Sequence, residues 1–528
     1  MKKLFALLLC FVMVFSMVAC GASESQPAEE TLGQNYEELE RVEAGNETVP
    51  QGETVVYKDE LVIGIDAALV TLNPVENAST ANYDYNNLAY DRLLYFNETT
   101  MEFEPELATE WTWTAENVLE LKLRDDVYFS DGSKFTADDV VYSLEILKDG
   151  VGTGTKLAIV DKVEAVDATT VKITLNSVNV DFLFTLSTPS TVIMSKAACE
   201  ADPENGYYVT TGAWIVEDFV PSDYVTLKAN ENYWGGTPNS KTITMRYVAE
   251  PSARLIALQN GELDICLRVS EEEAVYAQED PSIELTVIPT NTIVYFAFDT
   301  SEGPGADENL RLAIAHCLKK DDIIAAAANG YGKIAVSNWG HGTFGFDDSF
   351  GDYEYDLEKA KEYLAQAEYT EITAIVRGTK TRDVNALTVV QEQARQAGIT
   401  INIEGVEAAN LSEQTKFDNH THEAVVYSYG WSSYGDDSRY PYYIDSNANK
   451  ANLTNQEVMD LIDAAAKETD EEARKEMYAK VQAINHEHAY YLPMFYTVIF
   501  QGINKNVTGI TWGNLGNDFT YACVPVEG

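Results

Sequence analysis

The chain has 528 residues, and its 85 acidic residues outnumber its 36 basic ones, so the formal net charge is −49. It lacks the Lys and Arg clusters that phosphate binding needs, which excludes nucleic acid as a partner; we interpret the acidic surplus as a solubilising surface, or else as a field that favours cationic ligands. The length predicts two or three domains, and no stretch after the N-terminal region has the roughly twenty apolar residues of a transmembrane helix.

The N-terminus has the pattern of a secretory signal. Lys2 and Lys3 precede an apolar run over 4–18. The run ends in Met17-Val18-Ala19-Cys20, which resembles a bacterial lipobox. We expect a signal peptide over 1–19 and lipidation of Cys20, with an ordinary signal peptide and an incidental cysteine as the alternative.

Residues 20–55 are rich in Glu, Gln, Ser, Asn and Gly and poor in large apolar side chains. Such a segment buries too little surface to offset its ordering entropy, so we expect a flexible tether. Lipidated Cys20 would then hold the protein at the outer face of the cell membrane, in an extracytoplasmic location.

Four cysteines follow the tether, at spacings that match no zinc motif. One or two disulfides remain open, and four unpaired buried thiols are the favoured interpretation. The cysteines are Cys199, Cys266, Cys317 and Cys523.

The first half of the remaining chain alternates strand and helix patterns. A capped helix begins after Thr136, and the Asn260-Gly261 pair predicts a helix end. Strands are expected at 61–65, 119–123, 163–166, 170–175, 224–229, 242–248 and 264–267, and helices at 86–94, 136–144 and 252–259.

The alternation restarts near residue 291. Strands are expected at 293–298, 372–376, 399–403 and 491–500, and helices at 308–318, 357–368, 386–397, 455–468 and 471–486. Alternation in both halves predicts two α/β lobes rather than one large sheet.

Seven motifs occur in a fixed order along these elements. They are YDRLLY at 90–95, PELA at 105–108, LRDDVYFSDG at 123–132 with FTADDV at 135–140, NENYWGG at 230–236, ALQNGELD at 257–264, LRLAIA at 310–315 and YDLEKA at 355–360. Over residues 61–508 the chain resembles the family 5 extracellular solute-binding proteins that serve oligopeptide, dipeptide, nickel and glutathione ABC importers.

The resemblance implies an α/β, two-lobed periplasmic-binding-protein-like fold of type II, in the three-domain cluster C, with the ligand cleft between the lobes. The implied domains are a core of the first lobe from 56–85, 205–289 and 498–528, an accessory domain over 86–204 of that lobe, and a second lobe over 290–497. The hinge is expected near 289–295 and 494–498.

The implied function is that of a monomeric substrate-binding component of an ABC importer. It would capture short peptides or peptide-like solutes outside the membrane and deliver them to the permease, without a cofactor. No enzyme is expected, because the chain has no Gly-x-Ser-x-Gly, His-Glu-x-x-His or Walker A motif. The alternatives are a binding protein for a non-peptide solute, such as a nickel chelate or a sugar, and a sensing receptor without transport.

A strand over 424–430 leads into a polar turn, and in relatives this segment lines the cleft. Tyr429, Gly430, Trp431 and Tyr434 are therefore candidate ligand contacts. Peptide-binding relatives carry an aspartate where this chain has Tyr434, and Asp436 and Asp437 are the candidate replacements for binding an ammonium group. A second acidic position of some oligopeptide relatives is Ala68 here.

A peptide carboxylate is expected to bind an arginine. Arg377 occupies about the position of this arginine in dipeptide-binding relatives, and Arg382 is the alternative. The pairs His420/His422 and His486/His488 have i, i+2 spacing, which places their side chains on opposite faces of a strand and far apart around a helix, so no metal site is expected.

Overall fold

The computed structural model describes residues 56–526 except residues 77–78, 99, 101, 152, 180–181, 342, 417–419, 431–448 and 514–516. The expected signal peptide, Cys20 and the whole tether lie outside these residues, as do Trp431, Tyr434, Asp436 and Asp437. Within the described ranges, no helix combines the length and hydrophobicity needed to cross a bilayer.

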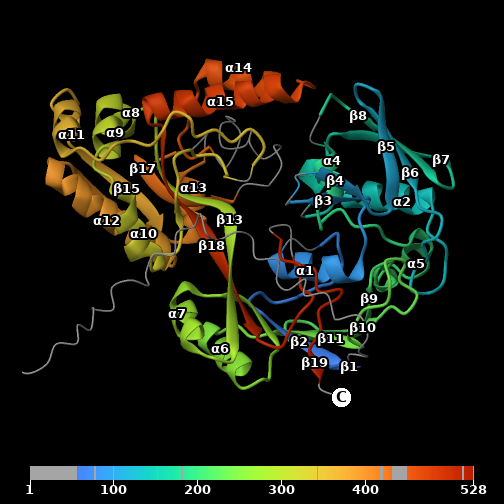
Figure 1. The fold of residues 1–528 in the computed structure, drawn as a ribbon. Coiled ribbons are helices and arrows are strands. Elements are labelled where there is room, and N and C mark those ends of the chain that lie inside the picture. The colour runs from blue at the N-terminus through green and yellow to red at the C-terminus, as the bar shows by residue number, and fades with distance from the viewer. Residues whose placement is uncertain are drawn as a thin grey trace, which may run out of the picture.

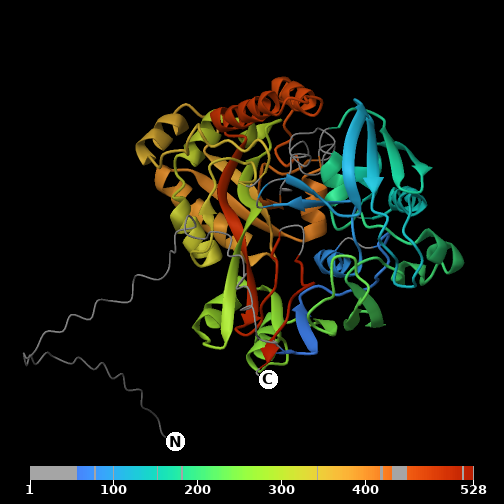
Figure 2. The ribbon, with the colours of Figure 1, turned by 45° about the vertical axis from the view of Figure 1, so that its right-hand side comes forward.

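The protein is a two-lobed α/β molecule (Figures 1 and 2). The first lobe contains β1–β12 and α1–α7, and the second contains α8–α15 and β14–β17. The two longest strands, β13 (Ile283–Phe298) and β18 (Tyr491–Asn504), run through both lobes. The two-lobed class expected from the sequence is confirmed.

The strands of both lobes form one hydrogen-bonded path in the described chain, so the expectation of separate sheets is wrong. The order is β16-β15-β17-β13-β18-β12-β2-β11-β10-β9 in an 11-stranded sheet, with β14 also paired to β18. The reason is the length of β13 and β18, because each extends beyond one lobe and pairs in both. The other strands of this sheet are β2 (Glu60–Ile65), β9 (Trp214–Val220), β10 (Tyr224–Ala229), β11 (Thr242–Tyr247), β12 (Ile265–Val269), β14 (Lys333–Ile334), β15 (Glu371–Arg377), β16 (Thr400–Val406) and β17 (Ala424–Gly430).

The pairing of β13 with β18 is irregular where the two strands pass from one lobe to the other. Pro289 pairs with Val498 and Ile293 with Tyr496, and the register shifts between these two pairs. The Oγ1 atoms of Thr290 and Thr497 lie 2.9 Å apart at this break. The ladder is therefore interrupted within the two segments that the sequence predicts as the hinge; hinge motion itself stays a prediction.

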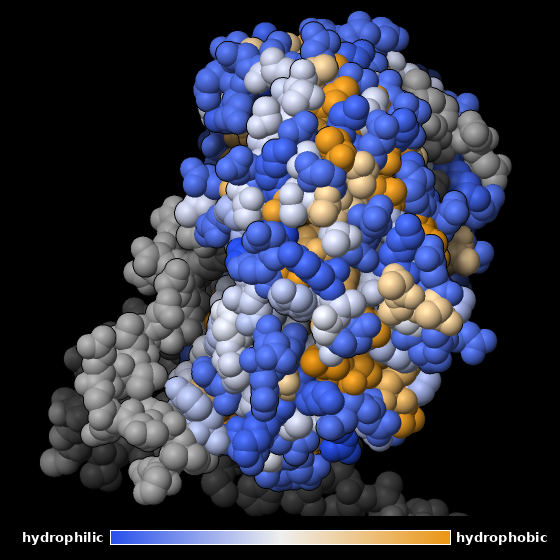
Figure 3. All heavy atoms as spheres, turned by 90° about the vertical axis from the view of Figure 1, so that its right-hand side faces the viewer, coloured by the Kyte–Doolittle hydropathy of each residue, from blue (hydrophilic) through white to orange (hydrophobic). Residues whose placement is uncertain are grey.

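The first lobe carries smaller sheets and its own helices. The strands are β1 (Val56–Tyr57) with β19 (Pro525–Val526), β3 (Leu94–Asn97) with β4 (Glu102–Pro105), and a four-stranded sheet of β5 (Ala108–Ala115), β6 (Val118–Leu123), β7 (Val160–Asp167) and β8 (Thr170–Leu175). The helices are α1 (Thr80–Ala89), α2 (Ala137–Leu147), α3 (Gly154–Leu157), α4 (Phe182–Ser187), α5 (Lys196–Ala201), α6 (Pro251–Gln259) and α7 (Glu271–Glu279). The face of the molecule nearest β5–β8 is largely hydrophilic, with apolar side chains interspersed among polar ones (Figure 3).

The second lobe is a sheet between two helical layers. One apolar cluster joins one face of β13, β15, β17 and β18 to α9 (Glu308–Ala315), α10 (Lys320–Ala328), α11 (Leu357–Leu364) and α12 (Thr381–Ala397). The other face packs on α13 (Ala408–Gln414), α14 (Gln456–Ala465) and α15 (Glu471–His488). The short α8 is Gly303–Ala306. At this edge of the sheet the strands β16, β15 and β17 are parallel, and helices cover both faces, which is the doubly wound arrangement.

The helix expected over 86–94 is wrong in its bounds. The side chain of Ser79 caps α1 by accepting from Asn82 N, and the helix ends at Ala89. Leu94 instead begins β3, which pairs with β4. The non-local strand pairing therefore prevails over the helical spacing of apolar residues in this segment.

The predicted helix start after Thr136 and the predicted helix end at Asn260-Gly261 are confirmed. Thr136 precedes α2 and donates its backbone N–H to Asp139 at 2.9 Å, and Gly261 has a φ of 72° after α6. The four cysteines of the described chain are unpaired and buried, as favoured from the sequence.

Candidate functional site

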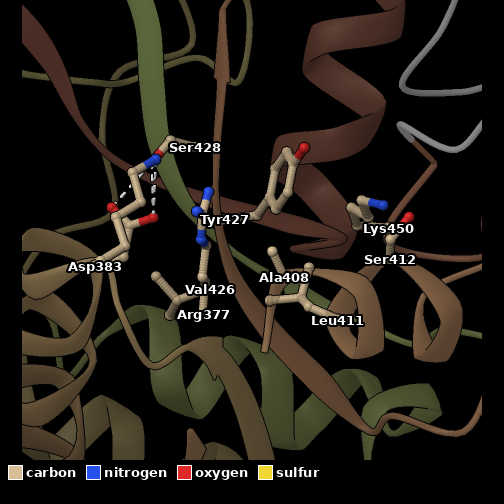
Figure 4. A pocket seen from close by; sticks show the side chains of 10 residues that line it. Arg377, Asp383, Ala408, Leu411, Ser412, Val426, Tyr427, Ser428 and Lys450 are labelled. Atoms are coloured by element: carbon tan, nitrogen blue, oxygen red, sulfur yellow. Dashed lines mark hydrogen bonds and ion pairs between the residues drawn. The ribbon is translucent and has the colours of Figure 1, made fainter. Parts of the chain in front are cut away.

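A pocket of about 180 Å³ lies at the carboxyl ends of β15 and β17 in the second lobe (Figure 4). These strands are parallel neighbours, with β16 on the other side of β15. The helices that follow β15 and β16 cover opposite faces of the sheet, so the strand order reverses at β15, and a crevice at such a point is where open α/β sheets bind ligands. The lining residues are Arg377, Lys380, Asp383, Ala408, Leu411, Ser412, Val426, Tyr427, Ser428 and Lys450.

The pocket is cationic although the chain is strongly acidic. Arg377, Lys380 and Lys450 line it together with a single carboxylate, Asp383. The chain as a whole has 85 acidic and 36 basic residues. The local sign is therefore opposite to that of the whole molecule and favours an anionic group of a ligand, not the cationic ligand considered from the net charge.

Asp383 is already neutralised by its neighbours. It is 2% exposed, and its carboxylate accepts from Ser428 Oγ at 2.9 and 3.0 Å. Lys380 Nζ and Arg382 Nε each lie 3.3 Å from it. Burial lowers the pKa of Lys380, and the Asp383 charge opposes this shift. The carboxylate thus ties the start of α12 to β17.

Arg377 is positioned by a tight turn. Lys380 N donates to Arg377 O at 2.9 Å, so these two residues form the first and last positions of the turn between β15 and α12. Arg377 is exposed, and its Nε donates to Thr379 Oγ1 at 3.1 Å. The other guanidinium nitrogens have no recorded partner in the described chain and are available to a carboxylate.

Arg382 has a different environment. It lies outside the pocket lining, and besides Asp383 it bonds Ser428 Oγ at 3.2 Å and Glu271 of α7 at 3.3 Å. Its guanidinium is therefore engaged within the protein, where it links the second lobe to α7 of the first. Of the two arginines predicted from the sequence, the structure places Arg377 in the pocket.

The remaining sequence candidates are only partly described. Tyr429 and Gly430 form the end of β17, opposite Ile293 and Thr292 of β13, and are not among the lining residues. Ala68 follows β2 in the first lobe. The proposed contacts of Trp431, Tyr434, Asp436 and Asp437 lie outside the described residues.

Lys450 and Tyr427 were not predicted from the sequence. Lys450 Nζ lies 5.1 Å from the Tyr427 ring centroid and donates to Thr415 Oγ1 at 2.8 Å. Tyr427 alternates with Val426 and Ser428 along β17, a pattern that indicates a strand but gives no sign of a pocket. Lys380 had a usable signal, because it lies three residues after Arg377 in a strand-to-helix turn.

The histidine pairs do not converge. The ring of His486 stacks on Tyr353, whereas His488 Nδ1 lies 3.2 Å from Glu308. His422 is buried, and His420 Nε2 lies 3.1 Å from Ser301 Oγ. In the described part of the chain, no group of three His, Cys, Asp or Glu residues has the arrangement of a metal site.

Comparisons with known proteins place this geometry in a family. The profile of the bacterial extracellular solute-binding proteins, family 5 Middle, matches residues 102–452. Heme-binding protein A of Haemophilus influenzae is 26% identical over 509 residues, covering 88% of this chain and 91% of the relative. Glutathione-binding protein GsiB of Escherichia coli is 25% identical over 469 residues, covering 85% and 91%.

A solved structure supports the fold independently. The ABC transporter substrate binding protein CtaP of Listeria monocytogenes matches with a TM-score of 0.79 and 23% identity, covering 86% of this chain and 95% of that one. The matched profile spans most of both lobes, including the pocket. The chain therefore belongs to the bacterial extracellular solute-binding proteins of family 5.

Proposed function

We propose that this protein is the substrate-binding component of an ABC importer that captures short peptides or peptide-like solutes and delivers them to the permease. The observation that supports the ligand class is the cationic pocket at the ends of β15 and β17, in a chain of net charge −49. A peptide always offers a terminal carboxylate unless it is capped. Arg377 and Lys380, at the two ends of one turn, would bind this carboxylate with charge-assisted hydrogen bonds.

The end of β17 would complete the site. Its edge beyond Gly430 leads into the segment that carries Trp431 and Tyr434, where main-chain groups would pair with an extended ligand and the aromatic rings would cover it. Asp436 or Asp437 would bind an ammonium group. One relative is named for glutathione, which is a peptide, and this supports the same ligand class.

A heme-type ligand is the second candidate, because the relative with 26% identity is named for heme binding. Such a ligand carries carboxylates, which the cationic pocket would also accept.

The cellular arrangement is part of the proposal. A lipid on Cys20 would anchor the monomer outside the cell membrane, with 20–55 as its tether. The core domain of the first lobe would comprise 56–85, 205–289 and 498–528, with 86–204 as accessory domain and 290–497 as second lobe. The lobes would close about the irregular level of β13 and β18, because a ligand that contacts both lobes favours the closed state.

A thermal-shift screen of the purified protein tests the ligand class. We expect di- to tetrapeptides to raise the melting temperature by mass action on the folded state, and the shift should grow with the logarithm of the ligand concentration above Kd. The same peptides with amidated C-termini are the matched control and should lose most of the effect. The peptide assignment fails if free peptides of every length are inactive while hemin, a sugar or a nickel chelate stabilises the protein.

A further inference from the structure

Lys450 is a buried cation that has no acidic partner among the described residues. Lys450 is 3% exposed, and its Nζ contacts Thr415 Oγ1 and the face of the Tyr427 ring. No carboxylate of the described chain forms an ion pair with it. Thr415 Oγ1 itself donates to Leu411 O at 2.8 Å, so this hydroxyl is already satisfied as a donor.

Another buried lysine of the described chain shows the usual solution. Lys320 is 6% exposed, and its Nζ forms an ion pair with Asp352 and donates to Ala335 O at 2.6 Å. Lys450 has a hydroxyl and a ring where Lys320 has a carboxylate and a carbonyl. A buried charge is costly unless it is paired, so the environment of Lys450 is unfavourable in the unliganded protein.

The position of Lys450 indicates where the missing anion comes from. It lines the same pocket as Arg377 and Lys380, and the Tyr427 ring stands between it and Arg377 (Figure 4). Lys450 lies beside Ser412 of α13, whereas Lys380 and Asp383 lie at the start of α12. The pocket therefore has two cationic ends on either side of one aromatic ring, and a single carboxylate cannot neutralise both.

We propose that Lys450 binds an acidic group of the solute that is distinct from the carboxylate held by Arg377, so that the preferred solutes are peptide-like molecules with two acidic groups. This inference rests on the function proposed above and narrows its substrate class. Burial lowers the pKa of Lys450 to about 8, and no acidic neighbour in the described part of the chain opposes this shift, which agrees with a cation that lacks its partner in the unliganded protein. An anion that enters the pocket gains a charge-assisted hydrogen bond and removes the cost of the unpaired charge.

Paired tripeptides test the proposal by isothermal titration calorimetry. Glu is placed in turn at each position of a trialanine scaffold, and each peptide is compared with its Gln counterpart, which has the same shape without the charge. For the natural protein we expect at least one Glu peptide to bind tenfold or more tightly than its Gln partner, the increment of one charge-assisted hydrogen bond. Lys450→Met should abolish this preference and leave the affinity for the Gln peptide nearly unchanged.

Lys416→Met is the matched control, since Lys416 is an exposed lysine just after α13 that pairs with Glu413 at 2.6 Å. It should retain the full preference, which separates a local effect from a change in net charge. Lys450→Gln is a second variant that keeps a polar group if the methionine variant does not fold, and it should also lose the preference.

Two kinds of result would overturn the inference. One contradicts only the role of Lys450, and the other also contradicts the proposed function. If Glu and Gln peptides bind the natural protein equally, or if the preference survives in the Lys450 variants, peptide binding stands and the role of Lys450 is wrong. If no peptide binds the natural protein at all, the proposed function fails and the inference fails with it.

Discussion

Arg377 and Lys450 both bring positive charge to the pocket, but they do so from opposite environments. Arg377 is exposed, and its guanidinium makes one hydrogen bond within the described chain, to Thr379 Oγ1. Lys450 is enclosed, at 3% exposure. A substitution at Arg377 should therefore change ligand binding alone, whereas a substitution at Lys450 should also change the stability of the unliganded protein.

For Arg377→Gln we expect the affinity for peptides with a free C-terminus to fall about 10- to 100-fold, the equivalent of about 1.5–3 kcal/mol for bonds between charged groups. The melting temperature of the unliganded protein should stay within a few degrees, because surface changes cost about 0.5 kcal/mol or less. Calorimetric titration and thermal unfolding measure the two quantities. Equal affinity of both proteins would remove Arg377 from the binding site.

The difference in stability between the Lys450→Met variant and the natural protein should depend on pH. Burial lowers the pKa of Lys450 from 10.5 to about 8, so between these values the unfolded chain binds more protons than the folded one. The contribution of Lys450 to folding is therefore most unfavourable below pH 8 and is progressively relieved as the pH rises toward 10.5. At pH 7 the variant should be more stable than the natural protein by about 2 kcal/mol, since one unit of pKa corresponds to about 1.4 kcal/mol and the lost packing offsets part of the gain.

Urea unfolding at a series of pH values measures this difference. The advantage of Lys450→Met should shrink between pH 8 and pH 10, and Lys416→Met should show no such trend. A constant difference across this range would mean that the Lys450 amine is not held in an unfavourable charged state.

At the scale of elements, the junction of α12 with β17 shapes the pocket. Asp383 in the first turn of α12 accepts from Ser428 of β17 and neutralises Lys380 and Arg382. A negative charge in the first turn of a helix also interacts favourably with the helix dipole. Without this carboxylate, the cations Lys380 and Arg382 and the Ser428 hydroxyl would face one another beside the pocket.

Asp383→Ala should therefore reduce the free energy of unfolding by about 3 kcal/mol, the cost of removing one partner from a buried charge cluster. Denaturant unfolding measures the loss. Asp321→Ala is a suitable control, because Asp321 lies in the first turn of α10 and is exposed. A loss at Asp383 no larger than at Asp321 would contradict the role assigned to the junction.

At the scale of the molecule, the lobes are joined through two crossing strands whose ladder is interrupted. The strands pair in regular register from Ile283 to Pro289, and beyond the break they pair again from Ile293 to Ala297, with a second register shift between Val294 and Tyr295. The link between Arg382 and Glu271 of α7 is a further connection between the lobes. We expect such an arrangement to allow a change in the angle between the lobes while each lobe keeps its own core.

We expect saturating ligand to reduce the radius of gyration in small-angle scattering, because a solute that contacts both lobes shifts the population toward the closed form. At a ligand concentration near the Kd of the natural protein, the Arg377→Gln protein should show a much smaller reduction, because its occupancy is lower. Identical scattering of the natural protein with and without bound ligand would contradict closure about the two strands.

The sequence by itself determined the alternation of strands and helices, the family and the capped ends of individual helices. These features depend on near neighbours, as in the contact of Thr136 with Asp139 and the left-handed φ of Gly261. Arg377 was also a candidate from the sequence, because the resemblance places an arginine of dipeptide-binding relatives at about this position, and its role in binding stays a prediction.

Only the tertiary structure decided the continuity of the sheet, the bounds of α1 and the position of Lys450. The single sheet arises because β13 and β18 pair along their length although about 200 residues separate them, as in the bond of Thr290 to Thr497, 207 positions apart. Lys450 is enclosed by Thr415, 35 residues away, and by Tyr427 of β17. Its polar surroundings in the sequence predict exposure; burial and an unpaired charge result from the packing of separate segments, which no local pattern records.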